Sequence, residues 1–240
     1  MDIGKSFNFV FEDKKGLEKV LIGGVLMFVP ILGSILLLGY GIQLVRNVRN
    51  HDPEPLPEWD DWGKKIAEGF KLFIVYFLWS LPLIILSLLI LIPMALGGNS
   101  DTGSAIASIF ALCFGCFTLI YAIVMWLATP SITIKFAETG EFADGLKFVE
   151  ILSFTKEHLG QILVVAIVSW LVYLLAGLLG SLLCLIGLFF TMFWASLVQY
   201  HMIGQIGLET TKPERPLETL SATEPAAELP ESAETESDNE

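Results

Sequence analysis

Five long apolar runs constrain what this chain can fold into more than any other feature of its sequence. They contain no acidic residue and, apart from Lys71 at the edge of one run, no Lys or Arg. About 20 helical residues cross the roughly 30 Å hydrocarbon core of a membrane. Only helices and closed β-barrels satisfy all their backbone hydrogen bonds there. These runs lack the alternation of barrel strands, which leaves helices. The sequence therefore predicts an all-α polytopic membrane protein, with apolar runs at residues 20–45, 70–96, 105–128, 159–177 and 182–203.

Composition agrees with this class and divides the chain in two. Hydrophobic residues make up 54% of the 240 residues and charged residues 17%, which is too apolar for an ordinary soluble domain. Ten of the 26 acidic residues but only two of the 14 basic residues lie in residues 209–240. That segment is rich in Glu, Pro, Ser, Thr and Ala and has no apolar period. We expect a multi-helix integral membrane domain over residues 1–208 and an acidic disordered tail over residues 209–240.

The first apolar run is interrupted by Pro30 and Gly33, which predicts a kink or reversal. If residues 20–45 form a short or re-entrant hairpin, all 14 Lys and Arg residues lie on one side of the membrane. If the run crosses once, Lys5 and three further lysines face the opposite side, giving five transmembrane helices as the alternative. Because cytoplasmic loops are enriched in basic residues, we favour the hairpin. The expected location is the cell (inner) membrane, multi-pass, with both termini in the cytoplasm.

A short sequence repeat supports the hairpin arrangement. The segment IAEGFKLF at residues 66–73 is echoed by FADGLKFV at residues 142–149. Each copy precedes a predicted pair of membrane helices, and Gly16 with Leu17 forms a weaker third copy. We therefore expect three units, each an amphipathic lead-in followed by a helical hairpin, and about six membrane segments. The repeated lead-in motif is carried by Gly69, Lys71, Gly145 and Lys147.

The first lead-in has two chemically distinct helix faces. With Asp60 or Asp61 as N-cap, an apolar face is expected at helical spacing. The opposite face carries charge, and its lysines would reach anionic lipid in the headgroup region. The apolar face comprises Trp62, Ile66, Phe70 and Phe73, and the charged face Lys64, Lys65, Glu68 and Lys71.

One polar heptad has no counterpart in the other units and is the candidate functional loop. Its three carboxylates and two tryptophans could hold a divalent cation or a cationic ligand. In the simpler interpretation, the proline and the aspartates start a helix and the tryptophans anchor it at the membrane interface. The heptad comprises Leu56, Pro57, Glu58, Trp59, Asp60, Asp61 and Trp62.

Other polar residues fit structural roles. Cys113 and Cys116 form a C-x-x-C pair inside an apolar run, without the second ligand pair of a structural zinc site, so we expect core packing. A set of His and Gln residues near the cytoplasmic ends of the last hairpin could form a polar site or bond between helices. No metalloprotease, nucleophile-elbow, P-loop or basic nucleic-acid motif is present. We expect no enzyme activity, catalytic residue, cofactor, metal or nucleic-acid partner; the His and Gln set is His158, Gln161, Gln199, His201 and Gln205.

Several of these motifs together resemble a family of prokaryotic integral membrane proteins known only as a domain of unknown function, DUF4013. The resemblance extends over roughly residues 5–208 and implies a multi-helix membrane domain, with no activity or catalytic residues to transfer. It rests on Gly39 and Tyr40, Arg46, the heptad, Gly69 to Lys71, Gly140 to Leu146, Gly187 to Phe190, Gln199, and Gly204 with Gln205.

Two functional hypotheses remain open from the sequence. The first is a non-enzymatic scaffold or lipid-interacting module, whose partners are membrane lipids and either further copies of the chain or another membrane protein. The second is a small channel or carrier for a neutral or lipid-like solute, with its pathway between the three hairpins.

Overall fold

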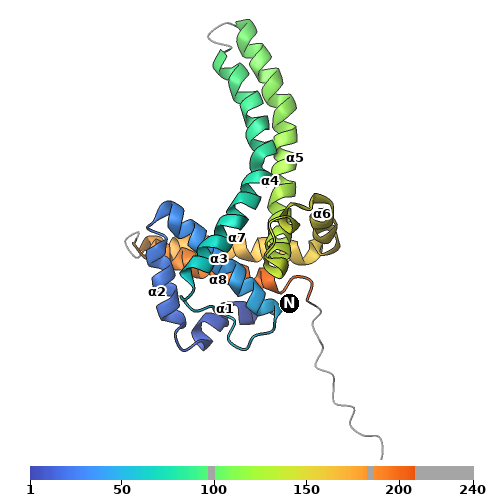
Figure 1. The fold of residues 1–240 in the computed structure, drawn as a ribbon. Helices are drawn as coiled ribbons and strands as arrows, with labels where there is room; N and C mark the ends of the chain where they lie inside the picture. Colours follow the sequence, from blue (N-terminus) through green and yellow to red (C-terminus); the bar gives the residue numbers. More distant parts are fainter. Residues whose placement is uncertain (97–100, 183–185, 209–240) are drawn as a thin grey trace, which may run out of the picture. The chain divides into compact units, whose positions relative to one another are not determined.

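The computed structural model describes residues 1–96, 101–182 and 186–208, and all regular structure in these ranges is helical (Figure 1). Met1–Leu208 form one compact unit, and the acidic tail lies outside the described residues. The predicted all-α class is confirmed, and α3, α4, α5, α7 and α8 are long and apolar enough to cross a membrane. The elements are α1 (Ile3–Glu12), α2 (Gly16–Leu26), α3 (Pro30–Arg49), α4 (Trp62–Leu96), α5 (Asp101–Thr139), η1 (Asp144–Leu146), α6 (Phe148–Glu157), α7 (Leu159–Leu182) and α8 (Ile186–Gly204).

The break in the first apolar run is confirmed, and it lies just ahead of Pro30. Helix α2 ends at Leu26 and α3 begins at Pro30, where the missing N–H costs nothing because first-turn amides have no helical partner. A Cβ on Gly33 would lie 2.0 Å from the Leu26 carbonyl oxygen, so the turn requires glycine there. Because α3 reaches 20 residues, the five-span alternative fits the structure.

Helix α3 packs against three other long helices, α4, α5 and α8. Two arginines at its C-terminal end hold the ends of other helices. Arg46 donates from Nε to the Ala137 carbonyl oxygen at 2.9 Å and lies 3.3 Å from the Glu68 carboxylate. Arg49 donates to the carbonyl oxygen of Ile206 at 2.9 Å and pairs with Glu138 on α5. Charge-assisted hydrogen bonds of this kind are the stronger ones.

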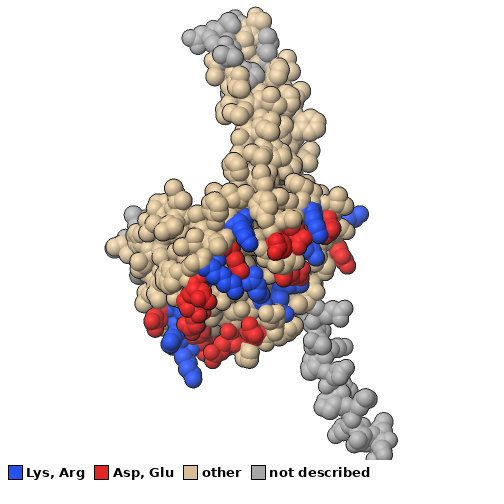
Figure 2. Space-filling view, viewed as in Figure 1, with Lys and Arg blue, Asp and Glu red and all other residues tan. Residues whose placement is uncertain are grey.

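The α4–α5 hairpin extends away from the other helices of the unit, and α7 and α8 run across its base (Figure 1). In the view of Figure 2, the charged side chains gather over the base and the shaft of the hairpin carries none. Large apolar side chains such as Leu88, Leu112 and Phe117 are exposed along it. Cys113 and Cys116 are also exposed and free, so the expectation of core packing is wrong for both; Cys184 lies outside the described residues.

Helix α1 joins the two ends of the unit through a buried polar contact with the end of α8. The backbone N–H of Asp2 donates to Gln205 Oε1 at 2.6 Å. The Ser6 hydroxyl oxygen, fully buried, lies 2.8 Å from His201 Nδ1. The Phe9 ring stacks on the His201 imidazole with centroids 4.4 Å apart. Polar satisfaction and aromatic packing therefore fix α1 against α8.

The sequence repeat does not fold as a structural repeat. Residues 66–73 are an internal part of the continuous helix α4, whereas residues 142–149 form a turn, the short helix η1 and the first residues of α6. Gly140, at φ +69°, ends the preceding helix immediately before the second copy. The second copy therefore lies outside α5 and leads into a separate short helix. The expectation of three equivalent lead-ins is wrong, because the first copy is instead an internal part of one continuous long helix.

The faces of the first lead-in also differ from expectation. Trp62, Phe70 and Phe73 are exposed, whereas Lys65 is buried. The apolar face of α4 is thus directed outward, as suits a surface in lipid, and the side packed against α3 contains Lys65 and Gly69. The pattern of residue types was right, but the assignment of Lys65 to the lipid headgroups is wrong.

Candidate functional site

The heptad lies in the α3–α4 loop (residues 50–61) and at the first residue of α4, where its backbone is bonded to neighbouring helices. The carbonyl oxygen of Leu56 accepts a 3.1 Å hydrogen bond from Lys19 Nζ, and that of Pro57 accepts one of 2.7 Å from the Tyr40 hydroxyl. Just before the heptad, Asn47 donates to the Pro55 carbonyl oxygen at 2.9 Å. Buried loop carbonyls need such partners, so the loop is fixed to α2 and α3.

Lys19 on α2 is the electrostatic centre of this loop. Its ammonium nitrogen lies 2.7 Å from Asp13 Oδ2 and 3.0 Å from Glu58 Oε1. The side chains of Lys19 and Asp13 are 5% and 7% exposed, but that of Glu58 is 56% exposed. Burial lowers the pKa of Lys19, but hydrogen bonds to Asp13 and Glu58 outweigh it, so the pKa is raised. Lys19 therefore stays charged inside the protein.

Trp59 packs among aromatic side chains of α3, α4 and α8. Its indole Nε1–H donates to the Lys19 carbonyl oxygen at 2.9 Å. Its ring stacks on Tyr40, with centroids 4.3 Å apart, and lies near Trp62 and Phe193. A face of the indole that could have received a cationic ligand is therefore covered by Tyr40.

The two aspartates of the heptad, Asp60 and Asp61, both bond to Lys65 in the first turn of α4. Lys65 Nζ donates to the carbonyl oxygen of Asp60 at 2.7 Å and to its Oδ1 at 2.9 Å. The hydrogen bond from Lys65 lowers the pKa of Asp60. Asp61 has φ +40°, and its carbonyl oxygen accepts the Lys65 N–H at 3.1 Å. The helix begins at Trp62, as the simpler interpretation of the heptad predicts.

Two of the three heptad carboxylates pair with ammonium groups. Glu58 pairs with Lys19 and Asp60 with Lys65. Within the described residues, no group of three or more His, Cys, Asp or Glu side chains is placed to hold a metal ion. The heptad thus forms a set of helix-to-loop contacts in which lysines engage the carboxylates of Glu58 and Asp60.

The lead-in motif residues make packing and surface contacts. Gly69 meets the α3 backbone, where a Cβ would lie 1.9 Å from the Ile35 carbonyl oxygen. Gly145 packs on Val75, and its carbonyl oxygen accepts a 2.9 Å hydrogen bond from Trp79 Nε1. Lys71 Nζ lies 3.5 Å from the Gly140 carbonyl oxygen, and Lys147 pairs with Asp144 at 2.9 Å.

The His and Gln set does not form one site. His201 and Gln205 bond to each other and to α1, with Gln205 Nε2 lying 3.0 Å from His201 Nδ1. His158 bonds to the Phe154 carbonyl oxygen of its own helix. Gln161 accepts from the Gly207 N–H at 2.8 Å, and Gln199 from the Tyr173 hydroxyl at 2.9 Å. Each therefore satisfies a separate helix end or helix–helix contact.

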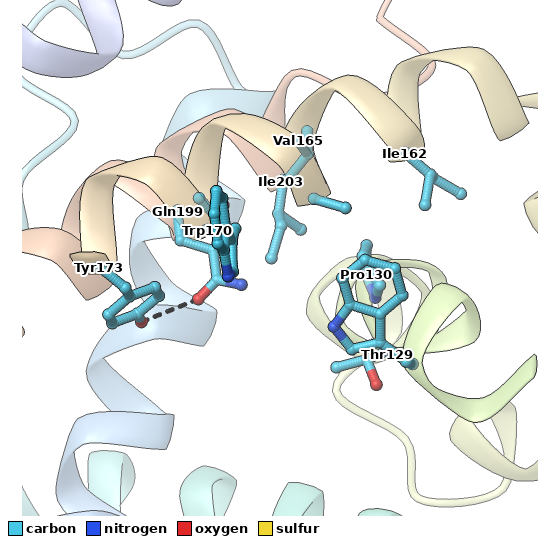
Figure 3. A pocket seen from close by; sticks show the side chains of 11 residues that line it. Thr129, Pro130, Ile162, Val165, Trp170, Tyr173, Gln199 and Ile203 are labelled. Atoms are coloured by element: carbon cyan, nitrogen blue, oxygen red, sulfur yellow. Dashed lines mark hydrogen bonds between the residues drawn. The ribbon is translucent and has the colours of Figure 1, made fainter. Parts of the chain in front are cut away.

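A pocket between α5 and the α7–α8 hairpin is a second candidate site, which the sequence did not reveal. Its cavity volume is about 250 Å³. Figure 3 shows Thr129 and Pro130 of α5 on one side and Trp170 and Gln199 on the other. No charged residue lines it, and the lining is mostly apolar: Trp126, Thr129, Pro130, Ile162, Val165, Ala166, Ser169, Trp170, Tyr173, Gln199 and Ile203.

Polar atoms in this pocket lack the partners that similar groups have elsewhere. The Ser169 hydroxyl is buried and has no hydrogen-bond partner. Pro130 has no N–H to offer the carbonyl oxygen of Trp126 one turn earlier. The Tyr173 hydroxyl donates to Gln199 Oε1, as Figure 3 shows, which leaves the amide nitrogen of Gln199 as a donor. Ser169 and Pro130 were visible in the sequence, but nothing there placed them together.

A large part of the membrane unit matches a known protein family. The family described as protein of unknown function (DUF4013) matches residues 22–185. The match includes the heptad and the α5 and α7 sides of the pocket, but not α8, where the resemblance also rested on residues 187–190, 199 and 204. No curated protein and no solved structure was found to match. Since the match covers more than half of the chain, the protein belongs to the DUF4013 family, whose function is unknown.

Proposed function

We propose that the protein is a non-enzymatic, lipid-interacting module of the cell (inner) membrane, with the α4–α5 hairpin crossing the bilayer. The observation that carries this proposal is the uncharged shaft of the hairpin. From Leu72 to Leu96, α4 has no Asp, Glu, Lys or Arg. At about 1.5 Å per residue this stretch is roughly 36 Å long, enough for a hydrocarbon core of about 30 Å. Its exposed apolar side chains, such as Ile85 and Leu88, would contact lipid.

The orientation follows from the charged base. Helix α4 begins and α5 ends at the base, where Arg46 and Arg49 of α3 also lie. Because Lys and Arg are enriched on the cytoplasmic side of a membrane, the base and the N-terminal helices belong in the cytoplasmic headgroup region. The tip of the hairpin then lies on the opposite side. The Trp59 and Lys19 contacts would hold the base together at this interface.

The geometry supports a carrier less well than it supports a lipid-interacting module. It requires a pathway between three hairpins, but the outer part of the described α4–α5 shaft stands clear of the other helices (Figure 1). The pocket beside α5 gives room for a lipid-like group at the base, which suits a lipid-interacting module as well as a carrier.

Orientation and membrane insertion can be tested together. In a chain with its three cysteines replaced by alanine, single substitutions Lys14→Cys and Thr102→Cys place a thiol near the base and near the tip. A membrane-impermeant maleimide applied to intact cells should label the Thr102→Cys variant, and the Lys14→Cys variant only after permeabilisation. Labelling of the Lys14→Cys variant from outside would refute the orientation. Extraction of the purified protein from phosphatidylcholine vesicles by alkaline carbonate would refute insertion.

A further inference from the structure

We propose that the pocket between α5 and the α7–α8 hairpin binds one acyl chain of an ester-linked membrane lipid, with the ester carbonyl at Ser169 and Gln199. This inference rests on the proposed lipid-interacting function and specifies its ligand.

The size of the pocket sets the extent of the ligand. A cavity of about 150 Å³ holds a benzene molecule, and drug-sized ligands occupy about 300–1,000 Å³. At about 250 Å³, the pocket accommodates a segment of one chain and excludes a whole lipid. A single apolar chain entering from the bilayer fits this volume.

The lining sets the chemistry of the ligand. Ile162, Val165 and Ile203 are buried and apolar, and no Asp, Glu, Lys or Arg lines the pocket. Placing an unpaired charge in such surroundings is strongly unfavourable. The bound part of the ligand is therefore uncharged, and a phosphate or amine headgroup must remain outside.

The unpartnered Ser169 hydroxyl indicates a polar atom on the ligand. Several hydroxyls on the other membrane-length helices bond to a carbonyl one turn earlier, as Thr118 does to Phe114 and Thr129 to Met125. Ser169 makes no such bond although it is buried, only 4% exposed. A buried hydroxyl without a partner is unfavourable because it has lost its hydrogen bonds to water, and an acceptor on a ligand would remove that cost.

Donor chemistry favours an ester carbonyl as this acceptor. Ser169 offers an O–H, and Gln199 offers N–H groups because its oxygen already accepts from Tyr173. Two donor side chains in the lining of one mostly apolar pocket suit an uncharged acceptor attached to a chain. Trp126, Trp170 and Tyr173 line the same pocket, and Trp and Tyr concentrate at the membrane interface, the level of lipid ester groups.

Photo-crosslinking in vesicles tests this assignment. The probes are a diester phosphatidylcholine and its dialkyl-ether analogue, each with a diazirine at the same chain position, in phosphatidylcholine vesicles. Peptides containing residues 126–130 and 162–173 are quantified by mass spectrometry. The diester probe should label these peptides about 3- to 10-fold more than the ether probe, the factor expected for one hydrogen bond. Ser169→Ala, which removes only the hydroxyl, should reduce this ratio towards one.

A steric variant with a matched control tests occupancy of the pocket. Ala166→Phe fills the space between α5 and α7 and should reduce labelling of the pocket peptides at least fivefold. Ile167→Phe, at an exposed neighbouring position outside the lining, should leave labelling unchanged. Equal labelling by the two probes in the wild type, or equal effects of the two Phe variants, overturns the pocket assignment. If the wild-type protein stays in the vesicles in that case, the proposed function still stands; if it is washed out, both fail.

Discussion

Gly39 on α3 and Gly69 on α4 lie where the two helix backbones touch. A Cβ on Gly69 would lie 2.8 Å from the Gly39 nitrogen, and a Cβ on Gly39 would lie 1.9 Å from the Lys65 carbonyl oxygen. Helix crossing therefore explains the glycine in the first copy of the lead-in motif. The same crossing positions Lys65 beneath the α3–α4 loop, so the loop geometry depends on it.

Replacing Gly69 with alanine should destabilise the protein by about 1–3 kcal/mol, the usual cost of overpacking against backbone. Gly63→Ala is the matched control on the same helix, because nothing lies within 4 Å of the added Cβ. It should be neutral or stabilising by up to about 1 kcal/mol, since alanine favours helix more than glycine does. Thermal unfolding in detergent micelles checks both; equal midpoints for the two variants would contradict the crossing.

Removing the charge of Asp13 should cost more than removing that of Glu58. Asp13→Asn keeps the oxygen that accepts the Lys15 N–H but leaves buried Lys19 with only an exposed partner. A loss of about 3 kcal/mol is expected for a broken buried pair. Glu58→Gln should cost less than about 1 kcal/mol, because the Glu58 carboxylate is largely exposed. Chemical unfolding of both variants measures the difference, and the reverse order would disprove the buried pair.

The ion pairs of the loop predict a stability plateau that ends at both extremes of pH. The pKa of Lys19 is raised in the folded protein, so its contribution is fully present below the unfolded value of about 10.4 and is lost as pH rises through the folded pKa. The pKa of Asp60 is lowered, so its contribution is present above about 3.9 and is lost as pH falls through the folded pKa.

Unfolding free energies measured across pH for two single variants separate these contributions. Lys19→Met should remove the alkaline decline that this residue causes, and Asp60→Asn the acid decline, each leaving the other limb in place. An unchanged alkaline limb in Lys19→Met would show that other groups control it.

Trp59→Phe should cost about 0.5–1.5 kcal/mol, because an aromatic ring is kept at this position but the hydrogen bond to the Lys19 carbonyl oxygen is lost. Trp62→Phe serves as the control, since Trp62 is exposed and begins α4. Its expected cost is below about 0.5 kcal/mol. Calorimetry in micelles compares the stabilities of the two variants. A larger loss of stability for Trp62→Phe would show that Trp59 does not have the structural role assigned to it.

The sequence predicted those features that are determined locally. Pro30 removes a backbone donor whatever its surroundings, so the break beside it was foreseeable. The apolar runs predicted the membrane-length helices because helix length and hydropathy are properties of a single segment. The repeat was misleading, because Gly140 ends one helix just before the second copy, whereas the first copy continues from Trp62 without interruption.

Contacts between distant segments were not predictable from the residues alone. Lys19 lies against the α3–α4 loop, whose Leu56 carbonyl oxygen and Glu58 carboxylate, 37 and 39 positions later, contact its ammonium group. Ser169 and Pro130 became part of one pocket only when α7 packed on α5. With no charge to mark it, the pocket had no sequence signal that differs from ordinary helix packing.

The contact of Asp2 with Gln205 has a consequence for biosynthesis. These residues are 203 positions apart, so α1 leaves the ribosome long before the end of α8, its docking partner, has been translated. Until then the part of α8 that covers Phe9 and Val10, both buried in the finished protein, is missing. Such transiently exposed surface is prone to misassembly. The contact between α1 and α8 therefore forms only after the helices between them in the sequence have been made.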